Sequence, residues 1–214
     1  MSTRQEHFAE VKGLARKFPA EVTTLAGFAD PTQESLQALA QLLQPGEVVG
    51  LFLHQAAQLP AGLISLRELP LVQMWHEGHA LDTPKAGFLE LAITDIPEMV
   101  ALAKLTEPGP FGTRTRELGT YIGIKKDGKL AAMAGERLKV PGCTEISAVC
   151  THPTQTGHGY ATALVAELTA KIHARGETPF LHARADNVRA TDVYRRLGFT
   201  ERFRFHLMVV GKAK

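Results

Sequence analysis

Cysteine and clustered metal ligands are both scarce in this sequence. Only two cysteines occur, Cys143 and Cys150, on either side of a β-rich stretch. Two thiols provide no disulfide framework to hold a fold together, and without clustered histidines they make a poor metal site. We therefore expect a reduced, cytoplasmic protein that binds no metal.

Long apolar runs and a strong excess of either charge are also missing. No apolar run reaches the ~18 residues that a membrane-spanning helix needs. Residues 1–18 carry Glu6 and Glu10 in place of the apolar block of a signal peptide. The formal net charge of +2 is too small to indicate a nucleic-acid partner, and no block of lysines and arginines changes that. We expect neither a membrane nor a nucleic acid as partner, and the 214 residues, 44% of them hydrophobic, can bury a proper core.

The N-terminal residues 1–80 are expected to form an α/β half of unknown role, with helices first and strands after them. Apolar residues at helical spacing predict one helix over residues 8–18. Asp30-Pro31, an N-cap residue before a proline, predicts the start of a second helix. We find no motif of a nucleophile and its base in this half. Three short β-rich stretches predict a small sheet: residues 47–54, 62–67 and 71–76.

A polar stretch with glycine and proline predicts a linker at residues 81–87, before a second domain over residues 88–214. The turn at Asp127-Gly128 predicts a hairpin within this domain. The elements expected there, in chain order, are a strand at 88–93, a helix at 95–105, strands at 121–125, 129–137 and 145–151, a helix at 159–173, a strand at 180–185, a helix at 188–197 and a β-rich end at 199–210.

A strand, a glycine turn and a helix follow one another between Glu145 and Val165. Gly157 and Gly159 allow the backbone to approach a ligand closely, because glycine has no Cβ. The first N–H groups of the following helix have no internal partner and carry a partial positive charge, which suits a pyrophosphate. The turn is not a Walker A motif, because no Gly-Lys-Ser/Thr follows it, and its spacing does not fit a dinucleotide fingerprint. A plain strand–turn–helix connection is the alternative.

A second strand and helix follow, with Asp186 or Asn187 as the helix cap and Tyr194 on the inward face. A strand–helix–strand crossover is right-handed, so strands 145–151 and 180–185 should run parallel. Both helices should then begin at the same edge of the sheet, which is where ligands bind in such layers.

These two motifs together resemble those of the GCN5-related N-acetyltransferase (GNAT) superfamily, and the later part is similar to its FR47-like branch. The family pattern is P-x-x-R-G-x-G-x-G/A, followed further along the chain by N-x-x-A-x-x-x-Y-x-x-x-G-F. Thr156 departs from this pattern, because the family usually has Arg or Gln there, so a pyrophosphate would lose a charged contact. The matching residues are Pro153, Gly157, Gly159, Ala161, Asn187, Ala190, Tyr194, Gly198 and Phe199.

The resemblance implies a GNAT α/β fold with a mixed sheet over about residues 86–214. Two-part members of this branch often place a smaller, degenerate copy of the fold in the N-terminal half. The resemblance also implies acetyl-CoA, or a close acyl-CoA, as co-substrate. The residues implied to hold it are Val149, Cys150, Thr151, Thr156, Gly157, His158, Gly159, Tyr160, Ala161, Asn187 and Tyr194.

Two residues are implied to be catalytic. Tyr194 occupies the family's position for the proton donor to the leaving thiolate, and a phenol with a pKa near ~10 can protonate a thiolate whose acid has a pKa near ~8.5. Glu145 occupies a family-like place for the base, or for a water relay, that takes the proton of the amine. A buried aromatic and a solvated carboxylate are the respective alternatives. Glu136 is the reserve base, and His152 and His182 are weaker candidates.

The implied activity is direct transfer of an acetyl group from the CoA thioester to a primary amine, without a metal. The acceptor is a small molecule or a peptide, whose pocket we expect from residues 107–115 and from the N-terminal half with Trp75. Cys150 has no His–Asp partners, so we expect a buried strand residue rather than a nucleophile. A glycine-acyltransferase-like amino-acid N-acyltransferase and a non-catalytic acyl-CoA-binding module stay open as alternatives. We expect a monomer or a homodimer.

Overall fold

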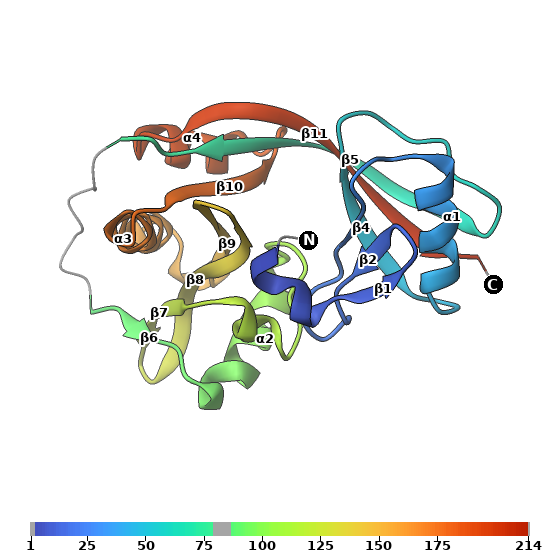
Figure 1. Cartoon of the computed structure of the whole chain (residues 1–214). Coiled ribbons are helices and arrows are strands. Elements are labelled where there is room, and N and C mark those ends of the chain that lie inside the picture. Colours follow the sequence, from blue (N-terminus) through green and yellow to red (C-terminus); the bar gives the residue numbers. More distant parts are fainter. Residues whose placement is uncertain (1–2, 79–86, 214) are drawn as a thin grey trace.

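The computed structural model describes residues 3–78 and 87–213, and its main feature is one eight-stranded sheet (Figure 1). β9 and β10 run parallel, and every other neighbouring pair in this sheet runs antiparallel. The predicted mixed α/β fold is therefore confirmed. The strands, in spatial order from one edge to the other, are β4 (Val48–Leu53), β11 (Thr200–Lys212), β5 (Leu63–Trp75), β10 (Thr178–Arg184), β9 (Cys143–Thr151), β8 (Lys129–Val140), β7 (Tyr121–Lys126) and β6 (Leu89–Glu90).

Helices cover both faces of the sheet. α3 packs beside β8, β9 and β10, and α2 packs against β8 and β9. Alternate residues of β8 show that these two helices lie on opposite faces, because Ala132 and Ala134 join the core under α3 whereas Met133 joins the core under α2. Within the described ranges, no helix is long and apolar enough to cross a membrane. The α-helices are α1 (Gln33–Leu42), α2 (Ile96–Thr106), α3 (Tyr160–Ala174) and α4 (Val188–Arg196), and the 3₁₀ turns are η1 (Thr3–Phe8), η2 (Ile93–Asp95), η3 (Thr115–Leu118) and η4 (Pro153–Gln155).

The helix predicted over residues 8–18 is wrong. This segment forms a hairpin of β1 (Glu10–Lys12) and β2 (Ala15–Lys17), and β3 (Ala26–Gly27) completes a small three-stranded sheet. Two of its apolar residues, Val11 and Leu14, are exposed, so the helical spacing of apolar residues does not mark a buried face. Gly13 has a φ of 51°, a left-handed conformation that turns the chain between the two strands.

The second predicted helix is confirmed as α1, although its cap differs from the expected one. The Oγ1 atom of Thr32 accepts a hydrogen bond from the backbone N–H of Ser35 at 3.1 Å, which makes Thr32 rather than Asp30 the N-cap. The apolar face of α1, with Leu36 and Leu39 buried, packs against β4 and β11.

The strands expected to form a small separate sheet belong to the large one instead. β4 pairs with β11, and β5 lies between β10 and β11, so residues from before and after the expected linker share one sheet. The stretches at 62–67 and 71–76 form a single strand of 13 residues, β5, which pairs with β11 along one edge and with β10 along the other. Residues 79–86, which include most of the expected linker, lie outside the described residues, and the division at 81–87 stays a prediction.

Candidate active site

The parallel strands β9 and β10 separate at one end and leave a wedge between them. Their pairing runs from Cys143↔Thr178 to Ile146↔Leu181 and goes no further. Beyond that point β9 pairs only with β8, and β10 pairs only with β5 through Arg184↔Leu71. The wedge opens at the carboxyl ends of both strands, which is the edge that the sequence predicted for a ligand.

A β-bulge bends β9 beside this wedge. Met133 of β8 pairs with Cys150 and Gly135 pairs with Ser147, so two residues of β9, Ala148 and Val149, stand opposite one residue of β8. Ala148 has a φ of 52°, which is uncommon for a residue with a Cβ. A bulge leaves backbone groups outside the ladder and re-aims the side chains around it.

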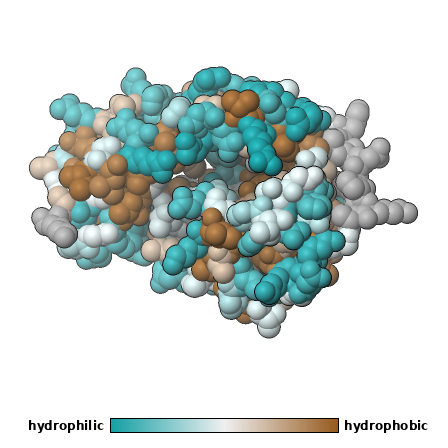
Figure 2. All heavy atoms as spheres, turned by 180° about the vertical axis from the view of Figure 1, so that it is seen from behind, coloured by the Kyte–Doolittle hydropathy of each residue, from teal (hydrophilic) through white to brown (hydrophobic). Residues whose placement is uncertain are grey.

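A cavity of about 620 Å³ lies at the wedge and extends across the sheet. The space-filling view from behind shows a hollow near the middle of that face, between two lobes of the molecule (Figure 2). The lining includes Val149 of β9, His182 of β10 and Tyr194 of α4, together with α2 and part of the expected acceptor loop, 107–111. Trp75 is not among the lining residues; its ring lies 5.0 Å from the guanidinium carbon of Arg202.

The glycine turn leads into α3 as the sequence predicted. Gly157 and Gly159 have φ values of 86° and 73°, and a Cβ at either position would meet no atom within 4 Å, so open space lies in front of both. The first intrahelical bond runs from the N–H of Ala163 to the carbonyl of Gly159 at 3.0 Å. The N–H groups that precede it have no intrahelical partner and are available to an anion. Thr156 and His158 are exposed at this turn.

The second motif places Asn187 and Tyr194 at the same edge. The Oδ1 atom of Asn187 accepts from the N–H of Ala190 at 3.1 Å and caps α4, as expected. Tyr194 is 8% exposed, so the expected inward face of α4 is confirmed. Burial raises the pKa of Tyr194 to about 12, so its hydroxyl stays protonated at neutral pH.

Glu145 lies in a buried ion pair at the narrow end of the wedge. Both of its carboxylate oxygens accept hydrogen bonds from Arg137, at 2.9 and 2.7 Å, and Oε1 also lies 2.8 Å from Nδ1 of His182. Burial alone would raise the pKa of Glu145, but the guanidinium group and the contact from His182 lower it to about 2. A carboxylate with so low a pKa is a weak proton acceptor at neutral pH.

A row of hydrogen-bonded side chains continues from His182 across the sheet. The amide nitrogen of Gln73 lies 3.0 Å from Nε2 of His182, and Arg202 donates to Oε1 of Gln73 at 2.8 Å. The contact from Arg202 assigns the two ends of the amide, so the Gln73 N–H donates to Nε2. The imidazole must then carry its proton on Nδ1, which donates to Glu145.

Of this row, Arg137 and His182 are the members that also line the cavity. The ring of Phe52 stacks on His182 with centroids 4.6 Å apart. The sequence ranked His182 low because it lies at a predicted strand end, where an exposed or satisfied histidine is the more common outcome. The partners that the structure gives it are remote along the chain, Glu145 at 37 and Gln73 at 109 positions. No local signal identifies Gln73, Arg137 or Arg202.

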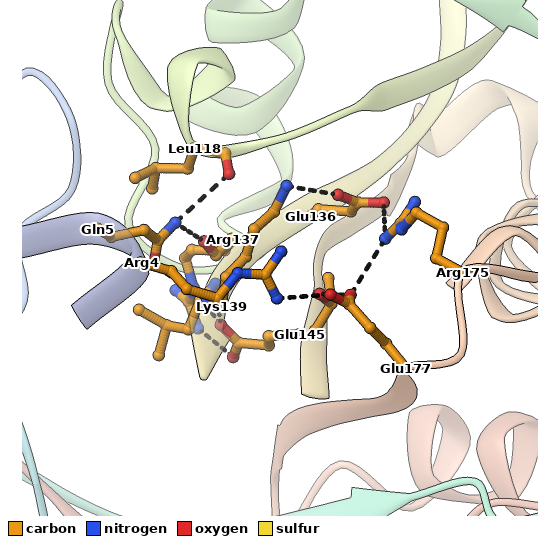
Figure 3. Close-up of polar contacts among 11 residues, drawn as sticks. Arg4, Gln5, Leu118, Glu136, Arg137, Lys139, Glu145, Arg175 and Glu177 are labelled. Atoms are coloured by element: carbon orange, nitrogen blue, oxygen red, sulfur yellow. Dashed lines mark hydrogen bonds and ion pairs between the residues drawn. The ribbon is translucent and has the colours of Figure 1, made fainter. Parts of the chain in front are cut away.

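The reserve base, Glu136, belongs to a different network (Figure 3). Its buried carboxylate pairs with Lys139 at 3.0 Å and with Arg175 at 2.8 Å. Arg175 and Arg4 both contact Glu177, at 3.6 and 2.5 Å, so the network ties η1 to the region after α3. Glu136 is not among the described residues that line the cavity, and these contacts indicate a structural role.

The remaining candidates are placed without a clear catalytic contact. Burial raises the pKa of the Cys150 thiol to about 11, which agrees with a strand residue and opposes a nucleophile. His152 is half-buried and Nδ1 contacts the hydroxyl of Thr154 at 2.8 Å. Within the part of the chain that the structure describes, no three His, Cys, Asp or Glu side chains are grouped to hold a metal ion.

The comparisons with known proteins agree with this geometry. Residues 121–207 match the model of the FR47-like protein family. A GNAT-family protein of Novosphingobium aromaticivorans is 35% identical, with a TM-score of 0.92, and the match covers 99% of this chain and 94% of that one. A GCN5-related N-acetyltransferase from Kribbella flavida shares the fold at 18% identity, with a TM-score of 0.64 and coverage of 96% and 89%. The chain has no match among curated proteins. The high identity over nearly the whole chain shows that it belongs to the GNAT family of acyltransferases.

Proposed function

We propose that the protein is an acetyl-CoA-dependent N-acetyltransferase that acts on a primary amine in the cytoplasm. The observation that carries this proposal is the wedge between β9 and β10, which opens into a cavity lined by both Tyr194 and His182. A titratable group that can accept a proton and one that can donate a proton therefore line the same cavity.

The residues at the wedge fit an acyl-CoA. Open space in front of Gly157 and Gly159, next to the first N–H groups of α3, suits a pyrophosphate. The bulge at Ala148 and Val149 supplies backbone N–H groups that we propose to polarise a carbonyl oxygen. When bound, acetyl-CoA supplies the thioester: the amine nitrogen bonds to its carbonyl carbon, the carbon–sulfur bond breaks, and CoA leaves as a thiol.

Tyr194 is the proposed proton donor. Its pKa of about 12 keeps the hydroxyl protonated and able to donate to the sulfur as the carbon–sulfur bond breaks. Because a thiol has a pKa near ~8.5, full transfer to a free thiolate is uphill, and the proton lost by the amine must restore the Tyr194 hydroxyl at the end of the cycle.

We propose that Glu145 acts through His182 rather than as the base itself. The amine would replace the Gln73 N–H at Nε2 of His182, and Nε2 would take one proton from the amine. Glu145, held by Arg137, would then face an imidazolium through Nδ1 and stabilise its charge. Glu145 is a positioning residue in this proposal.

Two alternatives remain, and one experiment separates them. A glycine-acyltransferase-like enzyme would release CoA only with amino acids, and a non-catalytic module would bind acyl-CoA without release. The test is a thiol-release assay with acetyl-CoA against a panel of amines, amino acids and peptides, beside calorimetric binding of CoA. We expect CoA binding and amine-dependent thiol release. Binding without release for any amine supports the non-catalytic module, and absence of CoA binding overturns the assignment of the wedge.

A further inference from the structure

We infer that the acceptor is an amine that also carries an apolar group and a nearby carboxylate, which is the chemistry of an apolar amino acid. This inference deepens the proposed function: it narrows the primary amine to that of an amino acid, the acceptor class of the first alternative above, and it rests on the proposed function for the position of the amine. It concerns the part of the cavity that neither the thioester nor the proton-transfer residues need.

The first observation is an apolar floor that continues away from the wedge. Side chains on one face of three neighbouring strands form it, through the cross-strand pairs Leu69↔Leu207 and Leu207↔Phe52. Leu71 of β5 extends this apolar floor to β10, the strand that carries His182. The cavity of about 620 Å³ is in the range that buries a complete small molecule. An acetyl group and a bare amine would leave most of it unfilled.

The second observation is an excess of cationic side chains on the lining. The acidic residue on the lining is Glu107, whereas Arg67, Lys104, Arg137 and Arg184 are basic. Arg137 is neutralised by Glu145, and its charge is therefore not available to a ligand.

The two remaining arginines, Arg67 and Arg184, line the cavity and are exposed. Arg184 donates to both oxygens of Asp186, at 2.9 and 2.6 Å. Arg67 lies close enough to lower the pKa of the same carboxyl group, although the Arg184 contact is the larger cause. The bidentate contact thus neutralises Arg184 with Asp186, and the positive charge of Arg67, which makes no such contact with a described residue, is left for a ligand anion. Among the described residues, Arg67 itself forms no ion pair.

The spacing between the two groups suits a single small molecule. His182 and Arg184 are two residues apart on β10 and point to the same face, which separates their Cα atoms by about 6.6 Å. An amine at Nε2 of His182 and a carboxylate at the guanidinium groups can therefore belong to one amino acid. Its apolar side chain would lie on Leu71 and Phe52. A long acyl chain on the thioester could also cover this floor, but it carries no anion to match Arg67.

The test is calorimetric binding of product analogues to the full chain in the presence of CoA. We expect N-acetyl-L-phenylalanine to bind at least tenfold more tightly than N-acetyl-L-phenylalaninamide, which lacks the carboxylate, and than N-acetylglycine, which lacks the apolar group. Arg67→Gln should reduce the preference for the acid over the amide by at least threefold. The matched control, Arg16→Gln, changes an exposed arginine of β2 and should leave the preference unchanged.

Each contrary result has its own meaning. Equal affinity for the acid and the amide would show that the site does not recognise a carboxylate. Equal affinity for N-acetylglycine would show that it does not recognise an apolar group. No binding of any analogue overturns the inference as a whole. If octanoyl-CoA binds tenfold more tightly than acetyl-CoA and the analogues do not bind, the floor belongs to an acyl chain. Binding does not require catalysis, so tight binding of the acid without thiol release from any amine would contradict the proposed function and leave standing only the site for an apolar carboxylate.

Discussion

Nδ1 of His182 lies 2.8 Å from Oε1 of Glu145 at the point where β9 and β10 cease to pair. The contact joins a buried, permanently charged carboxylate to an imidazole that lines the cavity. In the proposed mechanism this contact gives a carboxylate with a pKa of about 2 a part in proton transfer, because it would orient and stabilise the imidazole that takes the proton.

Replacing His182 should remove the proton acceptor without removing the acyl-CoA site. We expect His182→Ala to lower kcat/KM by a factor of about 100 or more, with the Kd for CoA unchanged within twofold. Imidazole added to the buffer should restore part of the rate, because it can enter the space vacated by the side chain. Steady-state kinetics with and without imidazole check this. A rate that is unchanged, or one that falls and is not restored by imidazole, would contradict the role of His182 as the base.

Tyr194→Phe should separate proton donation from binding. Loss of the hydroxyl should lower kcat by a factor of about 10 to 1,000, whereas CoA affinity should stay within twofold. Tyr121→Phe is the matched control, because the Tyr121 hydroxyl is buried without a hydrogen-bond partner among the described residues. That control should keep full activity and gain up to about 1 kcal/mol of stability. Equal activity of both variants would remove Tyr194 from the mechanism.

The sequence predicted the wedge better than it predicted the surroundings of His182, the proposed proton acceptor. Gly157, Gly159 and Asn187 act through local backbone geometry, so a short motif is enough to place them. The role of His182 depends instead on strand order, because Glu145 and Gln73 become its neighbours only when β10 lies between β9 and β5. That order requires β5 from the N-terminal half. Its β-rich pattern predicted a strand, but no local pattern shows that this strand pairs with β10.

The hairpin at residues 10–17 shows a second limit of prediction from local sequence patterns. Apolar spacing fits a helix there, but Ala15 and Lys17 are buried while Arg16 between them is exposed, which is the alternation of a strand. Lys17 is buried because Glu10 and Glu47 pair with its ammonium group, at 3.1 and 2.9 Å. A pattern that counts only apolar residues misses a lysine in the core.

Gly159→Ala should weaken acyl-CoA binding beyond its effect on folding. An alanine at φ 73° costs about 1–2 kcal/mol of stability in the left-handed region, and its Cβ would project into the space proposed for a phosphate. Gly142→Ala is a matched control, because Gly142 has the same φ of 73° and equally open surroundings in the turn between β8 and β9. The melting temperature should fall by a similar amount in both variants. Calorimetry should show at least tenfold weaker CoA binding in Gly159→Ala alone. Equal CoA affinity in both variants would argue against a phosphate site at the Gly157–Gly159 turn.

Removing Arg137 should strongly destabilise the fold. Arg137→Met leaves the fully buried carboxylate of Glu145 without its guanidinium partner, which costs about 3–5 kcal/mol. Arg4→Met breaks a more exposed ion pair with Glu177 and should cost no more than about 1 kcal/mol (Figure 3). Urea unfolding of both variants measures the difference. A loss below about 1 kcal/mol for Arg137→Met would mean that Glu145 is not held as a buried charge.

A pair of histidines should make the free energy of unfolding depend on pH in a window just below neutral pH. Nδ1 of His76 lies 2.8 Å from Nε2 of His173, and burial together with the neighbouring imidazole lowers the pKa of His76, while burial lowers the pKa of His173. The folded state therefore favours the neutral rings, and the unfolded chain binds protons first as the pH falls below about 6.5. Stability should be constant with respect to this pair above pH 7 and should fall on acidification, by at most about 1.4 kcal/mol per pH unit for each proton.

The decisive measurement for this pair is the free energy of unfolding between pH 5 and pH 8 for the wild type and two variants. His173→Gln removes one titrating ring and the repulsion on His76, so the fall below pH 6.5 should become shallower. His206→Gln, at an exposed histidine of β11, should leave the slope as it is. Glu145 contributes stability that is lost as the pH falls from about 4.5, the ordinary pKa of a glutamate, towards its folded pKa of about 2, so nearly all of that loss lies below this window. An unchanged slope in His173→Gln would show that the acid sensitivity of the fold arises elsewhere.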